Sequence, residues 1–335
     1  MLESDCVRVV LDEAEEAIRA LRAHGLLTKA RPQRSGNFLN VPVKDYRAAI
    51  AMLESRGVKA DPCRGSFEER PPASLPEDIG LSGYVKMGGI IVFSHARGVP
   101  FEAYVKAAVA VGAMYKDVES VFLKVGTVGE LRLPQLVLLY GSGSTTTRVR
   151  ENGLTFIIDV AKTYFNPKLA LERLRIAREV SDGEQVLDMF AGVGPFSITL
   201  ASRSACDVLS VDVNPYAVYL MAKNIELNSK RLKGRVHPLL ADSYTLADHI
   251  DGEFDRVIMN NPTSVTGFIK VACSLSSGQA KLHVYILSPS QEDALRSVMN
   301  TAQRVCKGVK VVQARRALDY SPSKFIYSVD IIVSR

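Results

Sequence analysis

Short apolar runs alternate with longer amphipathic segments over the second half of the chain. Runs of this length are typical of buried strands, whereas apolar residues that recur every three or four positions are typical of helices. The alternation predicts an α/β fold with a mostly parallel, doubly wound sheet. A short connection, Tyr320-Ser-Pro-Ser, joins the last two strands and favours an antiparallel pair. The expected strands span residues 184–190, 207–212, 235–241, 254–259, 281–287, 309–317 and 324–334, and the expected helices span 167–180, 215–229 and 291–307.

The first half of the chain has a different pattern. Apolar residues at helical spacing predict a helix over residues 7–25, and a second helix is expected over 45–56 with Asp45 as its cap. Strand-like runs dominate from residue 81 to about 160. The expected strands span residues 38–43, 88–93, 121–125, 136–140 and 154–159, with a helix over 100–116 and a turn over 141–148.

These patterns divide the chain into three expected domains. Residues 61–80 are rich in Pro, Arg, Ser and Glu, which is typical of a linker, although an ordered loop is the alternative. We expect a small N-terminal α+β domain over 1–65, a linker over 66–80, an α/β domain over 81–165 and a larger α/β domain over 166–335.

Composition narrows the classes of protein to consider. The 335 residues carry a formal net charge of +6, which is compatible with a polyanionic partner. The sequence has neither an apolar run of about 18 residues nor the pattern of a signal peptide, so we expect no membrane span. The five cysteines are scattered and form no CxxC pair, so they indicate neither a zinc site nor a disulfide framework. These features favour the reducing cytoplasm.

The segment from Val186 to Ile198 reads as a strand, a glycine turn and a helix start. Pro195 stands at a favoured first helical position, and the turn glycines Gly192 and Gly194 let a ligand approach the backbone. A dinucleotide motif would have a third glycine, but Ser197 occupies that place. Asp188, just before the turn, suits a cationic ligand such as S-adenosylmethionine. The alternative is an ordinary strand-turn-helix.

Polar side chains stand at the ends of three more expected strands. Asp212 follows the glycines by about 20 residues, where an acid commonly binds ribose hydroxyls. Asp242 ends the next strand, where a carboxylate suits an adenine amino group. In Asn260-Asn261-Pro262, the amide offers a donor and an acceptor, and Pro262 restricts the backbone before it, which suits gripping a planar base. Ligands bind at the carboxyl ends of parallel strands, so four such ends favour one ligand site over separate caps and a strand stop.

Two charged residues lie upstream of the glycine turn. Arg132 carries a planar fork of donors, but a lone arginine is typical of a protein surface. Glu172 lies in the expected helix that leads into the larger domain. It suits either a catalytic carboxylate or one half of a Glu–Arg surface pair, and its sequence position does not decide between them.

Several motifs together resemble one enzyme family. Over residues 129–322 the chain is similar to the archaeal and eukaryotic-type tRNA (guanine-37-N1)-methyltransferases, with the motifs in the family's order. The small N-terminal unit is also similar to the family's first domain. The resemblance rests on Gly129-Glu-Leu-Arg132, Arg150-Glu-Asn-Gly153, Asp159-Val-Ala-Lys-Thr-Tyr-Phe-Asn-Pro-Lys-Leu169, Glu172-Arg173, Asp188-Met-Phe-Ala-Gly-Val-Gly-Pro-Phe196, Ile258-Met-Asn-Asn-Pro262 and Tyr320-Ser-Pro322.

The resemblance implies a Rossmann-like class I methyltransferase sheet, S-adenosylmethionine as methyl donor and N1 of guanosine 37 of tRNA as acceptor. It implies Glu172 as general base and Arg132 as the group that stabilises O6. It also implies Asn260 and Pro262 as a base-gripping pair and Tyr164 as an active-site tyrosine. The cofactor-binding residues it implies are Lys168, Asp188, Phe190, Ala191, Gly192, Gly194, Asp212, Val213, Asp242, Ser243 and Asn260. No metal site is expected.

The expected partner is tRNA, bound through its anticodon stem-loop and its outer corner, and we expect a cytoplasmic monomer with no membrane contact. Residues 1–65 would recognise the tRNA, 81–165 would contribute to the active site, and 166–335 would bind the cofactor. Basic residues that are candidates for tRNA contact, each also compatible with a solvated surface, are Arg148, Arg150, Lys168, Arg175, Arg315 and Arg316.

Three residues depart from the family pattern. Asn261 stands where leucine is usual, Lys168 where arginine is usual, and Asn166 where serine is usual. Some archaeal members also methylate carbon 7 of the wyosine precursor 4-demethylwyosine, and that activity is the first alternative. An amino-group methyltransferase acting on DNA or protein is more distant, because Thr263 occupies the place of its usual aromatic residue. A non-catalytic RNA-binding module and, last, a dehydrogenase complete the alternatives.

Overall fold

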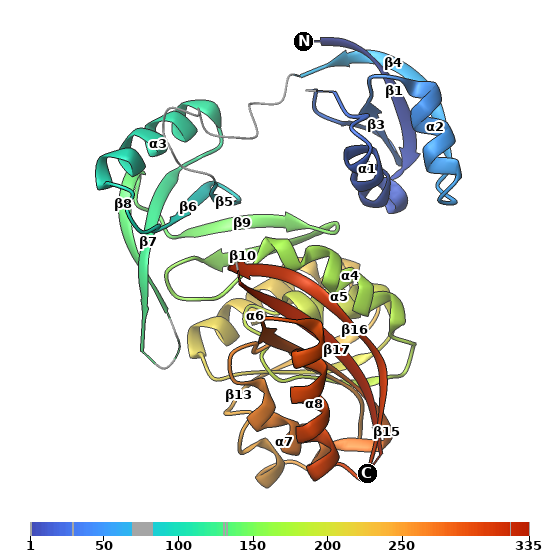
Figure 1. The fold of residues 1–335 in the computed structure, drawn as a ribbon, viewed down its shortest axis with the longest axis vertical. Coiled ribbons are helices and arrows are strands. Elements are labelled where there is room, and N and C mark those ends of the chain that lie inside the picture. The colour runs from blue at the N-terminus through green and yellow to red at the C-terminus, as the bar shows by residue number, and fades with distance from the viewer. Residues whose placement is uncertain are drawn as a thin grey trace. The chain divides into compact units, whose positions relative to one another are not determined.

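The computed structural model describes residues 2–28, 30–68, 83–129, 131, 133–321 and 323–334 (Figure 1). The chain divides into two compact units, Met1–Asp78 and Ile79–Arg335. Each unit encloses its own hydrophobic core, with Val7 and Leu53 fully buried in the first and Val186 fully buried in the second.

The first unit is an antiparallel sheet accompanied by helices. Its elements are β1 Leu2–Val10, α1 Ala14–Ala23, β2 Gln33–Ser35, β3 Phe38–Pro42, α2 Tyr46–Glu54 and β4 Ala60–Phe67. The strand order is β2-β3-β1-β4, so β1 lies between β3 and β4. Asp45 caps α2 as predicted, because its carboxylate accepts from the N–H groups of Arg47 and Ala48 at 2.9 and 3.1 Å.

The helix expected over residues 7–25 begins only at Ala14, so its first part was predicted wrongly. Residues 2–10 form β1, in which Val7 and Val9 are buried and Arg8 between them is exposed. That alternation has the period of a strand, and β-branched valine suits a pleated surface. The same apolar residues also fit a helical repeat, and pairing with β3 and β4 decides between the two.

The stretch interpreted as a linker is partly a strand, which corrects its predicted start. β4 pairs with β1 from Ala60 opposite Val9 to Phe67 opposite Leu2. It lies at the edge of the sheet, where a proline such as Pro62 is tolerated because one side of the strand has no hydrogen-bonded neighbour. Residues 69–82 lie outside the described part of the chain.

The second unit opens with a four-stranded sheet of order β5-β6-β7-β8 and a separate hairpin of β9 and β10. The elements are β5 Val85–Met87, β6 Ile90–Ser94, α3 Phe101–Met114, β7 Ser120–Val128, β8 Leu133–Gly141, β9 Thr146–Glu151 and β10 Leu154–Asp159. β9 was missed, because a turn was expected up to residue 148. Asn152 and Gly153, with φ of 52° and 78°, form its hairpin turn. An Asn-Gly pair is a known hairpin signal that could have revealed this strand.

The larger sheet confirms the predicted Rossmann-like arrangement. Its order is β13-β12-β11-β14-β15-β17-β16, parallel from β13 to β15 and antiparallel through β17 and β16. The elements of this part are α4 Ala170–Glu179, β11 Gln185–Asp188, α5 Pro195–Arg203, β12 Asp207–Asp212, α6 Pro215–Asn228, β13 Arg235–Leu240, β14 Phe254–Met259, α7 Ile269–Ser274, β15 Ser276–Ser288, α8 Gln291–Val305, β16 Gly308–Ser321 and β17 Lys324–Ser334. Helix α7 was not predicted.

Helices cover both faces of this sheet (Figure 1). Val186 on β11 packs in one core cluster with residues of α4, α5 and α6. Its neighbour Leu187 packs in a second cluster with residues of α7 and α8. Successive strand residues point to opposite faces, so both faces of β11 are buried, and the strand ends are the places left for polar chemistry. No helix among the described residues has the length and apolar character that a membrane crossing requires.

Two disulfides correct the expectation that the cysteines form no disulfide framework. Cys6 on β1 is bonded to Cys63, directly opposite on β4, and their Cα atoms are 4.8 Å apart. Cys273 in α7 is bonded to Cys306, which follows α8, with Cα atoms 5.7 Å apart. The partners are separated by 57 and 33 residues in sequence, so the fold brings them together and no local spacing reveals them.

Candidate active site

The glycine turn adopts a backbone that requires glycine. Gly192 and Gly194 have φ of +56° and +86°, in the left-handed region. A Cβ on Gly194 would lie 2.9 Å from Cγ of Met221, closer than packing allows. A Cβ on Gly192 would lie 3.5 Å from the carbonyl oxygen of Tyr164. The backbone of Tyr164 therefore lies against the turn, although the two segments are separate in sequence.

Asp188 is the last residue of β11, and only one of its two carboxylate oxygens has a hydrogen-bond partner among the described residues. The side chain is fully buried, and Oδ2 accepts from the Ser197 hydroxyl at 2.7 Å. Oδ1 is buried and has no hydrogen-bond partner among the described residues. Burial raises the pKa of Asp188 to about 7. A buried, unpartnered carboxylate oxygen fits a cationic group, and the α-amino group of S-adenosylmethionine is such a group.

Asp212 ties the second strand end to the glycine turn. Its Oδ2 accepts from the N–H of Gly192 at 2.7 Å, and its Oδ1 accepts from the N–H of Asn214 at 2.9 Å. Burial raises the pKa of Asp212. Val213, the next residue, is 56% exposed. The first two predicted strand ends are therefore joined directly.

Polar residues and two aromatic rings lie at the third predicted strand end. Asp242 is exposed and accepts from the N–H of Tyr244 at 2.8 Å, while buried Ser243 donates to the carbonyl of Met189 at 2.6 Å. The ring of Phe190 stands edge-on to that of Phe268, with centroids 4.9 Å apart. Phe268 was missed, because it lies in a short helical turn between predicted elements.

The Asn-Asn-Pro segment is held at the fourth strand end. Asn260 directly follows β14 and is half-buried. The carbonyl of Pro262 accepts from the N–H of Leu287 at 2.9 Å, near the end of β15. The carbonyl of Asn261 accepts from the N–H of Ser264 at 3.2 Å. The segment is therefore fixed by backbone hydrogen bonds to the same edge of the sheet as Asp188.

Glu172 is not half of a surface pair, because its side chain is only 4% exposed. Its Oε1 accepts from the Tyr285 hydroxyl at 2.7 Å and from Nη2 of Arg175 at 2.7 Å. Its Oε2 contacts the guanidinium of Arg315. Side chains of three residues therefore hold this one buried carboxylate. The ring of Tyr285 packs 5.7 Å from that of Phe196, the second residue of α5, which places Glu172 beside the glycine turn.

Behind Glu172 lies a buried charge network. Arg175 also donates to Asp330 at 2.8 Å, and Asp330 accepts from Nδ1 of His283 at 2.8 Å. Nη1 of Arg256 donates to the other ring nitrogen of His283 at 2.7 Å, so the ring is the neutral tautomer with its proton on Nδ1. Burial lowers the pKa of His283. Burial alone would raise the pKa of Asp330, but the His283 hydrogen bond and the charge of Arg175 hold it well below its usual range.

Arg173 anchors the start of α4. Its guanidinium donates to both carboxylate oxygens of Glu151 on β9 at 2.6 Å and to the carbonyl of Asn166 at 2.9 Å. The guanidinium also lies over the rings of Phe165 and Phe196. This buried pair holds the segment 164–166 and the helix that carries Glu172 in one arrangement.

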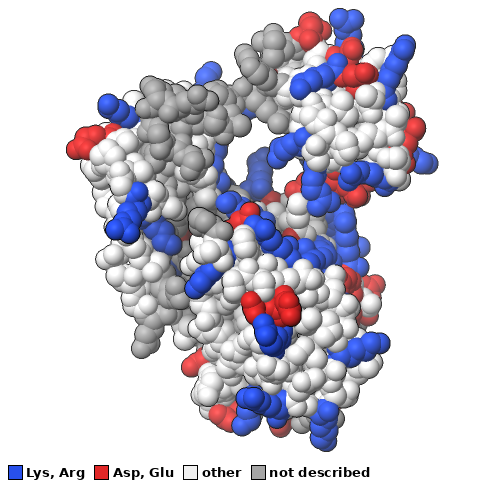
Figure 2. Space-filling model, viewed as in Figure 1, with Lys and Arg blue, Asp and Glu red and all other residues white. Residues whose placement is uncertain are grey.

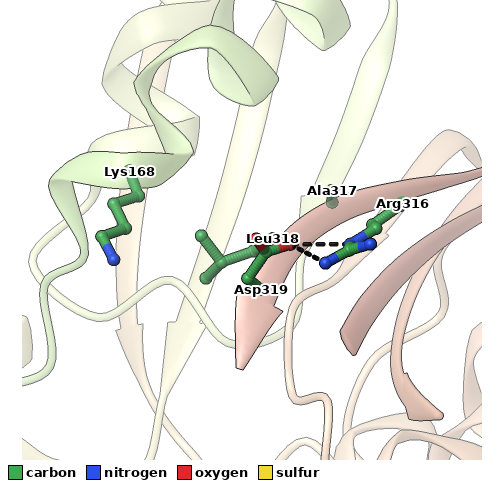
Figure 3. A pocket seen from close by; sticks show the side chains of 5 residues that line it. All are labelled: Lys168, Arg316, Ala317, Leu318 and Asp319. Carbon is green, nitrogen blue, oxygen red and sulfur yellow. Dashed lines mark hydrogen bonds and ion pairs between the residues drawn. The ribbon is translucent and has the colours of Figure 1, made fainter. Parts of the chain in front are cut away.

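An open pocket lies between the helical turn Pro167–Leu169, which precedes α4, and β16 (Figure 3). Its volume is about 390 Å³, and it is lined by Lys168, Arg316, Ala317, Leu318 and Asp319. Arg316 points toward Asp319 and donates to it at 2.6 Å. Lys168, a predicted cofactor ligand, therefore lines this pocket at β16.

Three further predictions have separate outcomes. Arg132 lies outside the described residues, so its predicted place in the site is not described. Tyr164 is 66% exposed, and its hydroxyl accepts from Nδ2 of Asn166 at 3.3 Å. Among the expected tRNA contacts, Arg148 and Arg150 are exposed on β9, whereas Arg175 is engaged by buried acids. Figure 2 shows Lys and Arg side chains gathered around β9 and α4.

Comparisons with known proteins show the family to which this chain belongs. The model of the TRM5/TYW2 methyltransferase domain matches residues 147–312. The tRNA (guanine(37)-N(1))-methyltransferase Trm5b of Pyrococcus abyssi is 32% identical, over 98% of each chain. The chain belongs to the TRM5/TYW2 methyltransferase family. It is therefore an S-adenosylmethionine-dependent methyltransferase.

Solved structures of this family agree. The crystal structure of Pyrococcus abyssi Trm5b superposes with a TM-score of 0.68 at 31% identity, covering 99% of this chain and 100% of that chain. A structure of aTrm5 in complex with tRNALeu has a TM-score of 0.68 at 27% identity, covering 98% of this chain and 99% of that chain. A further relative, Taw22 of Nanoarchaeum equitans, is named a tRNA (guanine(37)-N(1))/4-demethylwyosine(37)-methyltransferase and is 32% identical over 56% of this chain and 59% of its own.

Proposed function

We propose that the protein transfers a methyl group from S-adenosylmethionine to N1 of guanosine 37 in tRNA. The observation that carries this proposal is the buried Glu172 carboxylate beside the glycine turn. Methyl transfer to a protonated ring nitrogen needs a base within reach of the methyl donor. Family membership and the name of the Pyrococcus abyssi relative support the same acceptor.

The chemistry gives each predicted residue a task. N1 of guanine must lose its proton as the methyl group arrives, and Glu172 is the base that accepts it. Negative charge then builds on O6, where the resemblance implies Arg132 as a stabilising donor. Asn260 and Pro262, held at the end of β14, grip the base after it has left the anticodon stack. Tyr164, exposed beside the glycine turn, offers a ring for the base to stack on.

We propose that the cofactor binds along the carboxyl ends of the parallel strands β11, β12 and β13. The free Oδ1 of Asp188 binds the α-amino group, and Asp212 lies where ribose hydroxyls would reach it. The adenine lies between Asp242 and the paired rings of Phe190 and Phe268. The remaining predicted cofactor contacts are Lys168, Ala191, Gly192, Gly194, Val213, Ser243 and Asn260.

A second candidate is methylation of carbon 7 of 4-demethylwyosine, instead of or in addition to N1 of guanosine. The observation that favours it is the similarity to Taw22, whose name carries both activities. The amino-group methyltransferase is set aside, because the chain belongs to a different methyltransferase family.

Mass spectrometry of nucleosides separates the two candidates. The enzyme is incubated with the cofactor and either unmodified tRNA or tRNA that carries the wyosine precursor at position 37. We expect 1-methylguanosine from the first tRNA. A product from the precursor alone would replace the proposal by the second candidate, and no product from either would refute both.

Substitution of the base tests the mechanism. We expect Glu172→Gln to slow methyl transfer by about 100-fold or more, since general bases contribute on that order. Binding of S-adenosylmethionine, measured by titration calorimetry, should be unchanged. Glu226→Gln is the matched control, because Glu226 is exposed on α6, and it should keep the full rate. Full activity of the Glu172 variant would remove Glu172 as the base, and absent cofactor binding by the wild type would favour a non-catalytic module.

We propose tRNA as the partner, which the complex of the aTrm5 relative with tRNALeu supports. We further propose that the protein contacts the anticodon stem-loop and the outer corner of the tRNA. Exposed Arg148 and Arg150 suit phosphate contacts, so affinity should fall as salt rises. The monomeric state and the cytoplasmic location remain predictions. Sedimentation of the protein with and without tRNA tests the first of them.

A further inference from the structure

The two oxygens of the Glu172 carboxylate have different surroundings. Oε1 takes hydrogen bonds from Tyr285 and Arg175 at 2.7 Å each. Oε2 contacts the guanidinium of Arg315 on β16, and among the described residues no other group bonds to it. A proton taken from a substrate therefore goes to Oε2, and Arg315, which contacts that oxygen, is released from the ion pair as the proton arrives.

The guanidinium groups of Arg175 and Arg315 differ in how many hydrogen-bond acceptors they have. Arg175 also bonds to Glu179 at 2.7 Å and to Asp330 at 2.8 Å, so it is held inside the protein. Arg315 has a side chain that is 34% exposed. Its buried Nε and Nη2 have no hydrogen-bond acceptor among the described residues, although Nη2 touches Oε2 of Glu172 without hydrogen-bond geometry. Burial lowers the pKa of Arg315, because the cation is partly desolvated without full compensation. A donor left over beside the carboxylate suits a further acceptor from outside.

The Watson–Crick edge of guanine has the matching pattern. Its N1–H donor stands directly beside its O6 acceptor. Oε2 of Glu172 and the guanidinium of Arg315 present an acceptor directly beside donors, and arginine is a common partner of guanine O6. We propose that Arg315 donates to O6 of the target guanine while Oε2 of Glu172 receives the N1 proton.

Methyl transfer breaks two bonds and forms two. The N1–H bond breaks and its proton goes to Oε2 of Glu172. The electron pair on N1 forms the bond to the methyl carbon, and the bond from that carbon to sulfur breaks with its electrons left on sulfur. Arg315 meets the negative charge that builds on O6 during this step. O6 has two lone pairs, so the hydrogen bond from Arg315 occupies only one of them.

The inference rests on the proposed function, and a comparison of two tRNAs tests it. One tRNA carries guanosine at position 37, and the other carries 6-thioguanosine, whose sulfur is a weak acceptor. Single-turnover rates are measured for the wild type, Arg315→Gln and Lys310→Gln. Lys310 is the matched control, because it is an exposed cation on the same strand and loses the same charge.

We expect Arg315→Gln to lower the rate on guanosine 37 by about 100-fold, the usual cost of removing one oxyanion donor. On 6-thioguanosine the same substitution should cost several-fold less, because the lost hydrogen bond was weak there. Dissociation constants for the cofactor and for tRNA should stay unchanged, and Lys310→Gln should match the wild type. Equal losses on both tRNAs, or a loss confined to tRNA affinity, would overturn the inference.

Two controls keep the result interpretable. If Arg315→Gln does not fold, Arg315→Lys keeps the charge without the planar fork, and its loss should likewise shrink on 6-thioguanosine. Wild-type transfer to guanosine 37 is measured in the same series. Its absence would refute the proposed function, whereas its presence with a full rate in Arg315→Gln would refute this inference alone.

Discussion

Replacing Asp188 by asparagine should stabilise the free protein and weaken cofactor binding at the same time. The wild-type carboxylate is fully buried, and its Oδ1 has no partner among the described residues. Asparagine has nearly the same shape, and its side-chain oxygen can still accept from Ser197. It removes a buried charge, but it also removes the partner that we propose for the cationic end of the cofactor.

The magnitude follows from the pKa of Asp188. Burial raises it to about 7 in the folded protein, whereas an unfolded aspartate has a pKa of about 3.9. A difference of about 3 units costs the wild type about 4 kcal/mol above pH 7, where both states are ionised. The buried amide group of asparagine lacks an acceptor, which costs about 2 kcal/mol. The net gain in free energy of unfolding is therefore about 2 kcal/mol at pH 8.

The sign of the pH dependence is fixed by the same shift. Between pH 4 and 7 the folded wild type binds more protons than the unfolded chain, so its stability falls as pH rises. The side-chain amide of the Asp188→Asn variant does not titrate, so the variant's advantage grows from pH 4 to pH 7 and is constant above. Below about pH 4 both states of the wild type are protonated, and the charge term vanishes.

Urea unfolding at pH 5 and pH 8 without cofactor measures the stability, and calorimetric titration with S-adenosylmethionine measures the affinity. We expect the variant to gain more at pH 8 than at pH 5 and to bind the cofactor about 30-fold more weakly, on the scale of a lost charge-assisted hydrogen bond. A variant that is less stable at pH 8, or that binds the cofactor normally, would show that Asp188 serves the fold instead of the ligand.

Further predictions concern the partners of the base and the turn. Tyr285→Phe removes the hydroxyl that donates to Oε1 of Glu172, so the single-turnover rate should fall by about 10-fold, the scale of one hydrogen bond to a charged group, with cofactor affinity unchanged; an undiminished rate would contradict this role. Gly194→Ala should lower the free energy of unfolding by about 1–3 kcal/mol in urea titrations, because its Cβ would meet Met221 and its φ is left-handed. Arg173→Met should cost about 3 kcal/mol or more by leaving the Glu151 charge buried alone, and wild-type stability would refute that.

Local motifs predicted the geometry of the glycine turn, because its determinants lie within single segments. Asp188, Gly192 and Gly194 form one strand-turn-helix, and the structure shows both the left-handed glycines and the buried acid. Asp212 was predicted from its distance to the glycines, and its carboxylate does bond to Gly192. The residues that contact the glycine turn in space are mostly residues close to it in sequence.

The surroundings of Glu172 could not be predicted, because they depend on the sheet order. Tyr285 is 113 residues away in sequence, and only the placement of β15 beside β14 brings it to α4. His283 and Asp330 meet through the antiparallel register of β15 and β17, where they stand directly opposite each other. None of these residues belongs to a recognisable local spacing.

The central claim is that Glu172 removes the N1 proton of guanosine 37 during methyl transfer. Single-turnover transfer from labelled S-adenosylmethionine to tRNA with guanosine or adenosine at position 37, by the wild type and by Glu172→Gln, tests it most directly. We predict rapid transfer in one case alone, the wild type with guanosine, and a rate about 100-fold lower for the variant. Equal transfer to the adenosine tRNA, or an undiminished rate in the variant, would contradict the claim.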